Sequence, residues 1–258
     1  QTGVDLSGTT VTVSGSSKTV TGIDFTGYRL INTGNNNIFE DCIGDFNTTG
    51  QTGNKRQWDI RGANPTVRYC KITNPTPIGG VYGLATFDAT GTITLDHNDV
   101  RDAAAQDVIA GPDVGGGSNV LIVTETLIKG IHLTVGAHVD TIDGRGGAPG
   151  STISRNFIIG DKTPTSAPAG SGTGFTNAFH DLPTDPHGSP CNGWIIIENI
   201  IVGSDDPGAQ SIFVQVGNSA STGIRMYDII YDLREHNSLL HPSVRVDDWY
   251  ARSFDYAA

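Results

Sequence analysis

Apolar and polar residues alternate along most of this chain in short segments that end at turn-forming residues. Segments such as "GTITLDHNDVRD" and "NGWIIIENIIVG" read as strand, turn and strand, with Gly, Asn, Asp or Pro at the breaks. Period-two alternation places successive side chains on opposite faces of a strand, and the segments lack the 3.6-residue spacing of an amphipathic helix. The pattern therefore predicts an all-β chain of many short strands.

The strand-like segments recur at a nearly constant interval. Aligned on their apolar residues, they share one small, mostly polar position, occupied by Cys42, Cys70, Asn98, Thr126, Asn156, Asn199 and Asp228. Successive members are 28, 28, 28, 30, 43 and 29 residues apart. Such a period is typical of units that stack because none can bury its apolar face alone. We therefore predict a parallel β-solenoid of about seven or more rungs, with this series as an inward polar ladder.

The period divides the chain into three parts. Residues 1–36 are expected to form a cap and the first strands, 37–232 the solenoid, and 233–258 an aromatic C-terminal cap that covers the last rung or packs on a neighbouring subunit. The interval of 43 marks an insertion at about 162–191, which is rich in Pro, Gly, Ser and Thr. Long loops on a regular scaffold are disproportionately functional.

Two of the three cysteines, Cys42 and Cys70, fall one rung apart. Adjacent rungs lie within the Cα separation that a disulfide tolerates. Stacked free thiols are the simpler interpretation, and a disulfide stays open. Neither residue has metal-type spacing to Cys191, so zinc is not expected.

Composition narrows the possible partners. The chain of 258 residues has a formal net charge of −11, which speaks against nucleic acid and anionic membranes as partners. No apolar run approaches the roughly 18 residues of a membrane-spanning helix, so membrane insertion is not expected. The initial "QTGVDLSGTT" lacks the features of a signal peptide. A mature extracellular protein, a virion protein or a fragment of a longer chain would all fit.

Several rung segments resemble a known family. The sequences "NIFEDCIG", "TVRYCKIT" and "STISRNFIIGD" are similar to the rung strand of pectin-lyase-like, right-handed parallel β-helices, over roughly residues 23–232. The resemblance implies a single-stranded right-handed β-helix. The family includes pectate and alginate lyases, polygalacturonases, and bacteriophage tailspikes and tail fibres, so a polysaccharide partner and a homotrimer or larger tail assembly are compatible with it. Fold alone does not identify a function.

Acidic residues recur in the strand upstream of each ladder position. These strands are "QWDIRG", "LATFDAT", "AQDVIAG", "HVDTIDG" and "NAFHDLP". Stacked in register, they would form a carboxylate column of Asp59, Asp88, Asp107, Asp140 and Asp181. Like charges one rung apart raise one another's pKa, so such columns persist where they hold a cation, grip sugar hydroxyls or perform acid–base chemistry. Ca²⁺ is therefore a compatible but not a required cofactor, and solvated surface acids are the alternative.

The stretch "GAHVDTIDG" is similar to a His–x–Asp–x–Ile–Asp/Gln motif of β-helix proteins from phages and secreted bacterial enzymes. His138 could act as a general acid or base, or could be a turn histidine that satisfies backbone groups. Asp140 should share the side of His138, whereas Asp143 should fall on the opposite side or in the next turn. Arg145 could neutralise a uronate carboxylate.

The insertion adds ionisable groups one rung later. It contains His180, Asp181, Asp185 and His187, and Trp194 follows it, either stacking on a sugar ring or packing the core. The expected catalytic residues are His138, Asp140, Asp143, His180 and Asp181. The expected substrate contacts are Asp107, Arg145, His187 and Trp194.

Three functions fit these features. The polygalacturonase-type Gly–His–Gly and Arg–x–Lys elements are absent, and neither Lys129 nor Arg155 stands out as a lyase base. We therefore predict an extracellular glycan-recognising protein, most like a phage tailspike, that binds surface polysaccharide; whether it also cleaves the polymer stays open, and depolymerisation is the favoured of the two outcomes. A secreted polysaccharide lyase or glycoside hydrolase is the alternative, and a non-catalytic structural or receptor-binding solenoid is the second.

Overall fold

Buried and exposed side chains alternate along the strands, as the sequence pattern predicted. In β13 (Thr92–Asp96) and β16 (Val120–Thr124), every second side chain is buried and those between them are partly exposed. The computed structural model describes residues 4–7, 9–45, 55–73, 81–86, 88–104, 108–111, 118–131, 140–143, 149–160, 177–181, 193–202, 212–216, 225–231 and 248–253. The secondary structure of these residues is entirely β.

Sheet A holds nine strands in the order β1 (Val4–Ser7), β2 (Thr10–Val13), β4 (Arg29–Asn32), β7 (Lys55–Ile60), β11 (Val81–Ala85), β15 (Ile109–Ala110), β18 (Asp140–Asp143), β21 (Asn177–Asp181) and β23 (Ile212–Val216). Sheet B has two rows. Row 1 comprises β3 (Thr19–Thr21), β5 (Ile38–Glu40), β9 (Thr66–Arg68), β13, β16 and β19 (Thr152–Ser154). Row 2 comprises β6 (Ile43–Asp45), β10 (Lys71–Thr73), β14 (Asp99–Ala104), β17 (Leu127–Ile131) and β20 (Phe157–Gly160).

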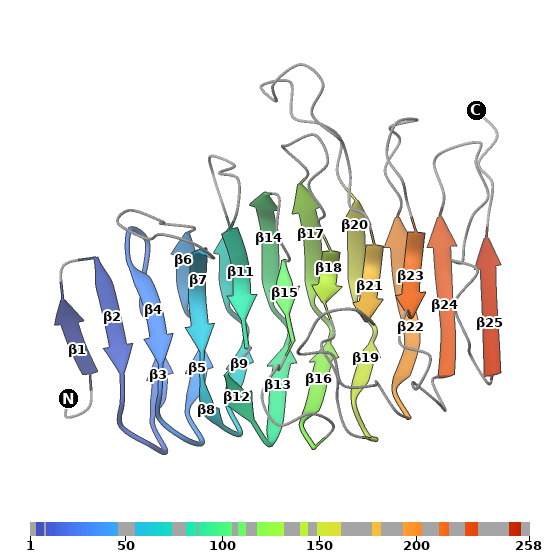
Figure 1. Ribbon diagram of the computed structural model, residues 1–258. Coiled ribbons are helices and arrows are strands. Elements are labelled where there is room, and N and C mark those ends of the chain that lie inside the picture. The colour runs from blue at the N-terminus through green and yellow to red at the C-terminus, as the bar shows by residue number, and fades with distance from the viewer. Residues whose placement is uncertain are drawn as a thin grey trace.

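The two rows of sheet B join near the C-terminal end. There β22 (Ile195–Val202) pairs with both β19 and β20, and β24 (Arg225–Tyr231) and β25 (Asp248–Ser253) continue the sheet. The short strands β8 (Gly62–Ala63) and β12 (Ala89–Thr90) pair separately. Among the described strands, the pairings are parallel except for β1 with β2. Figure 1 shows the colour advancing steadily from one end of the molecule to the other, as expected of a parallel β-solenoid.

Strand pairing confirms the repeat read from the sequence. Along row 2, Ile43 pairs with Lys71, Lys71 with Asp99, and Asp99 with Leu127, at intervals of 28 residues. Leu127 then pairs with Phe157, and Phe157 pairs with Ile200 across the longer interval. The insertion predicted at 162–191 contributes β21 to sheet A, and the rest of it lies outside the described residues.

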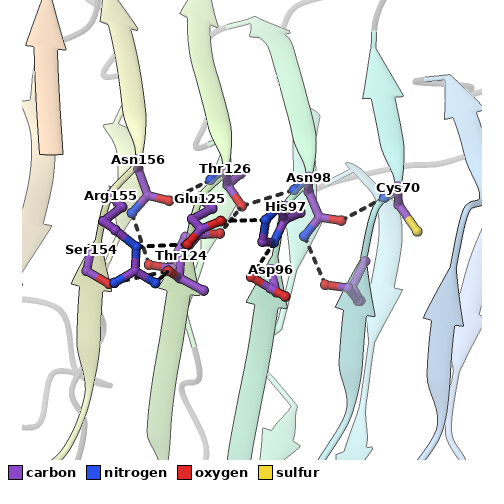
Figure 2. Close-up of polar contacts among 12 residues, drawn as sticks. Cys70, Asp96, His97, Asn98, Thr124, Glu125, Thr126, Ser154, Arg155 and Asn156 are labelled. Atoms are coloured by element: carbon purple, nitrogen blue, oxygen red, sulfur yellow. Dashed lines mark hydrogen bonds and ion pairs between the residues drawn. The ribbon is translucent and has the colours of Figure 1, made fainter.

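The polar ladder is present and continuous between the rungs that carry it (Figure 2). The backbone N–H of Cys70 donates to Oδ1 of Asn98 at 3.0 Å, and that of Asn98 donates to Oγ1 of Thr126 at 3.2 Å. Thr126 N–H donates to Oδ1 of Asn156, and Asn156 N–H to Oδ1 of Asn199, both at 2.9 Å. These side chains are buried, so each one satisfies a backbone group that would otherwise lack a partner.

A sharp corner precedes each of these ladder positions. The residue just before it has a φ between 50° and 59°, in the left-handed region that non-glycine residues seldom adopt: Asp41, Tyr69, His97, Glu125, Arg155 and Glu198. Backbone bonds between rungs hold this conformation; for example, His97 N–H donates to the carbonyl of Thr124 at 3.0 Å. The corner turns the chain from row 1 to row 2 and leaves its own side chains exposed.

Inward side chains of all three strand rows form the core. In sheet A, Leu30, Trp58, Leu84, Ile109 and Ile142 face one another rung by rung and are 0% exposed. This register leaves the alternate residues of sheet A on the outer face, which carries the polar groups described below. The described residues include no helix of the length and apolarity that a membrane crossing requires.

Candidate functional site

Sequence-predicted site residues fall into three groups. His138, Arg145, His187 and Asp107 lie outside the described residues. Asp140, His180 and Asp181 have described strand positions only, so their contacts stay predictions. Asp143 and Trp194 are placed with their side chains.

Trp194 is 0% exposed and belongs to the main hydrophobic core. It therefore packs the interior and presents no ring face to a sugar, which corrects its expected role in substrate contact. A large aromatic side chain buried just before β22 stabilises the rung by removing apolar area from water.

The carboxylate column expected from the sequence does not form in the expected register. Asp59 pairs with Ala85, and Asp88 lies in a turn beyond the end of β11. Asp140 pairs with Asn177, so it does not face Asp181. The physical reason is that the buried apolar residues of each strand set the register, and the acids do not keep a constant offset from them.

The observed outward column of sheet A is mixed. In register order it runs through Asp59, Ala85, Ala110 and Asp143, and the strand register continues from Asp143 to His180 and Gln215. Asp143 is 1% exposed, and it lies on the face opposite the core residue Ile142. Because neighbouring parallel strands lie about 4.8 Å apart, Asp143 and His180 hold adjacent positions in the strand register.

The strongest charged cluster of the described residues lies at the N-terminal half of the same face. Asp59 is 0% exposed, and three guanidinium groups converge on it. Arg29 and Arg61 each donate from Nη2 to Oδ2 at 2.6 Å, and Arg61 Nε also donates to Oδ1 at 3.1 Å. Arg56 Nη1 lies 3.4 Å from Oδ1. We call these four residues, together with Asp88, the arginine cluster.

Electrostatics of the cluster follow from this geometry. Burial raises the pKa of Asp59, but the hydrogen bond from Arg61 and the charges of Arg61, Arg56 and Arg29 outweigh it and lower the pKa below its ordinary value. The hydrogen bond to Asp59 in turn raises the pKa of Arg61. Asp59 is therefore ionised and serves as the common anchor of the three arginines.

Within the described part of the chain, the arginine cluster holds more guanidinium groups than carboxylates. Arg56 also reaches Asp88 at 3.0 Å, and Arg61 Nε lies 3.6 Å from the same carboxylate oxygen. Among the described residues, three guanidinium groups face two carboxylates in this cluster, on a chain whose net charge is −11. The side chain of Arg61 is 38% exposed, so solvent and ligands reach it.

Two buried polar atoms at the cluster have no hydrogen-bond partner among the residues that the structure describes. They are Nε of Arg29 and Oε1 of Gln57, whose amide nitrogen donates to the carbonyl of Tyr28 at 2.7 Å. A network optimised only for stability would satisfy such atoms, because leaving them unpaired is costly. The sequence analysis missed this cluster, although the density of charge in "KRQWDIRG" around a core tryptophan was a signal for it.

A second polar network lies on the corner between the two rows of sheet B (Figure 2). His97 contacts Asp96 through Nδ1 at 2.8 Å and Glu125 through Nε2, and Glu125 accepts a bond from Arg155 Nε at 2.8 Å. Tyr69 stacks beside His97 with ring centroids 5.0 Å apart. These groups bind one another across successive rungs, so we assign the network to joining rungs.

No three His, Cys, Asp or Glu side chains group as metal ligands within the part of the chain whose side chains are described. The expected Ca²⁺ concerned the acids of sheet A, most of which lie outside that part, and it stays a prediction. The chain matches no protein-family model, no curated protein and no solved structure. The assignment to the parallel β-solenoid architecture therefore rests on the strand pairings and the ladder.

Proposed function

We propose that this protein is an extracellular or virion-borne β-solenoid of the pectin-lyase-like type that binds acidic cell-surface polysaccharide on the outer face of sheet A. The observation that carries the proposal is the convergence of Arg29, Arg56 and Arg61 on buried Asp59. A planar guanidinium group donates two parallel hydrogen bonds to a carboxylate or sulfate, which suits it to an acidic sugar.

The rest of the molecule supports an acidic ligand at this place. A surface with a net charge of −11 repels a polyanion, so attraction has to come from a local concentration of cations. The arginine cluster provides that concentration, and Asp59 holds the guanidinium groups in place before a ligand arrives. Successive rungs of a solenoid offer a long, regular surface that matches a repeating polymer.

Binding tests this proposal directly. The affinity of the full chain for a uronate-bearing polysaccharide would be compared with its affinity for a neutral polysaccharide of similar length. We expect Arg61→Gln to weaken binding of the acidic polymer about tenfold, which corresponds to the loss of one charge-assisted hydrogen bond of about 1.4 kcal/mol. The affinity should also fall as salt is added.

Arg155→Gln is the matched control, because Arg155 is 53% exposed and lies on the corner of sheet B. It should bind like the parent protein. Equal affinity of the parent for neutral and acidic polymers, or an unchanged affinity of a folded Arg61→Gln protein, would contradict the proposal.

Cleavage of the bound polymer is the second candidate function. It is favoured by the strand register, which pairs Asp143 with His180, because a carboxylate and an imidazole are residue types that commonly work together in acid–base catalysis. An assay for reducing ends and for the ultraviolet absorbance of unsaturated uronates would separate hydrolysis from elimination. Activity should be lost in both Asp143→Asn and His180→Ala. Activity that both variants retain would exclude this pair.

A further inference from the structure

Cys42 and Cys70 occupy adjacent steps of the polar ladder. Strand pairing places Ile43 beside Lys71, and Lys71 N–H donates to the carbonyl of Cys42 at 2.9 Å. The two cysteines immediately precede this pair and are therefore direct neighbours. Strands about 4.8 Å apart fall within the roughly 4.4–6.8 Å that separates the Cα atoms of a disulfide.

Both cysteines are free thiols in the core, 0% and 2% exposed. Sγ of Cys42 lies 3.3 Å from the carbonyl oxygen of Glu40, and Sγ of Cys70 lies 3.3 Å from that of Arg68. The largest influence on the pKa of each thiol is its hydrogen-bond interaction with the other thiol. At this step, therefore, sulfur takes the place of the amide or hydroxyl oxygen of later rungs.

The shared hydrogen bond makes the two thiols unequal. Donation from Cys70 lowers the pKa of the Cys42 thiol to about 7, whereas the same interaction raises the pKa of Cys70. Cys42 is therefore the sulfur that ionises first, and the thiolate is the form that attacks a disulfide.

We propose that Cys42 and Cys70 form a redox-controlled cross-link between the first rungs of the solenoid. With a low-molecular-weight disulfide such as oxidised glutathione, the Cys42 thiolate attacks one sulfur and releases one small thiolate. The Cys70 sulfur then attacks Cys42, which forms the protein disulfide, and releases the second small thiolate. Both small thiolates leave with the protons of the two cysteines, so two protein thiols are oxidised and one small disulfide is reduced.

The cross-link would close one complete turn of the solenoid as a covalent ring. That turn contains Arg56, Asp59 and Arg61 on β7 and in the turn after it. A bond across its ends restricts the unfolded chain and resists separation of the two rungs. The proposal rests on the geometry of the ladder and is independent of what the arginine cluster binds.

Mass spectrometry of the full chain tests the proposal. The protein would be incubated with oxidised glutathione or with a reductant, its remaining thiols would be alkylated in denaturant, and its peptides would be analysed. We expect a peptide pair that joins Cys42 to Cys70 in the oxidised sample and alkylation of both in the reduced one. The oxidised protein should also unfold at a higher urea concentration.

Two variants serve as controls. Cys191→Ser should retain both the cross-link and the shift in the urea midpoint, whereas Cys70→Ser should lose both. The oxidation would be repeated at a urea concentration just below the unfolding transition, so that the rungs open and the oxidant reaches the thiols. Full alkylation of Cys42 and Cys70 under both conditions would overturn the proposal. A cross-link through Cys191 in place of this pair would also overturn it. The peptide analysis of the unaltered protein does not depend on whether a variant folds.

Discussion

At the scale of single residues, Asp59 takes its properties from neighbours that are distant in the sequence. It has no exposed surface, yet its pKa lies below the ordinary value because three arginines outweigh the effect of burial. Arg29 comes from the preceding rung, 30 residues earlier. Protonation of Asp59 removes the negative charge that the three arginines surround and leaves their positive charges uncompensated. The stability of the cluster should therefore depend on pH.

We expect the free energy of unfolding to fall as the pH is lowered through the pKa of Asp59 in the folded protein. Unfolded Asp59 has the ordinary pKa of 3.8, and the folded value is lower. The unfolded state therefore binds more protons between the two values, and the contribution of Asp59 is complete above 3.8 and lost below the folded pKa. Urea denaturation from neutral pH down to about pH 2 measures this dependence.

Asp59→Asn is the comparison for this measurement. The variant should be less stable at neutral pH and should lose less stability on acidification than the parent. Parallel pH curves for the two proteins would show that Asp59 does not contribute in this way.

At the scale of elements, the corners between rows 1 and 2 of sheet B decide the path of the chain. Each corner uses a non-glycine residue with positive φ just before a ladder residue. The conformation costs about 1–2 kcal/mol for a residue with a Cβ atom, and the backbone bonds between rungs offset it. The corner side chains therefore differ in type from rung to rung, while the backbone conformation repeats.

Substitutions at Glu198 test the role of the corner backbone. Its φ is 59° and its side chain is exposed. We expect Glu198→Val to lower the free energy of unfolding by about 1–2 kcal/mol, because a β-branched residue fits the left-handed region poorly. Glu198→Asn should change it little, since asparagine adopts this region readily. Urea denaturation of both variants gives the comparison, and equal stabilities would contradict the backbone explanation.

At the scale of the whole molecule, each rung is stabilised by its contacts with the rungs on either side. The ladder joins the rungs by one side chain for each step, from Cys70 to Asn199. Solenoids of this kind behave as one-dimensional arrays in which a local defect weakens adjacent units first. A defect in the ladder should therefore lower the stability of the adjacent rungs more than that of the rungs at the far end.

Asn98 is the position at which to test this behaviour. Its Oδ1 accepts from Cys70 N–H, and its Nδ2 donates to the carbonyl of Val67 at 2.9 Å. Asn98→Ala removes both hydrogen bonds and leaves the Cys70 N–H without its ladder acceptor, which should cost about 2–4 kcal/mol. Asn98→Thr keeps an acceptor, as Thr126 does in the next rung, and should cost less.

Hydrogen exchange would locate the effect of Asn98→Ala. Protection should fall first in β9, β10, β13 and β14, which flank Asn98, and less in β19 and β20. A uniform loss of protection along the solenoid would indicate that the molecule unfolds as one cooperative unit.

The sequence predicted some features of the candidate site and not others. Asp143 is the one expected catalytic residue whose side chain is described, and it lies on the face opposite Ile142 with almost no exposure. The prediction of a carboxylate column was wrong because acids in successive rungs need not occupy paired positions in the strand register. The arginine cluster escaped notice because Arg29 and Arg61 are not at repeating positions and meet only at Asp59.

The sequence by itself determined the parallel solenoid, its period and its ladder, because these depend on local alternation and on one position repeated in each rung. Only the tertiary structure decided the left-handed corners, the burial of Trp194 and the charges that surround Asp59. Those features depend on which side chains the rungs bring together, and that depends on register. Register follows the packing of buried apolar residues such as Trp58 and Leu84, which a one-dimensional pattern of charges does not contain.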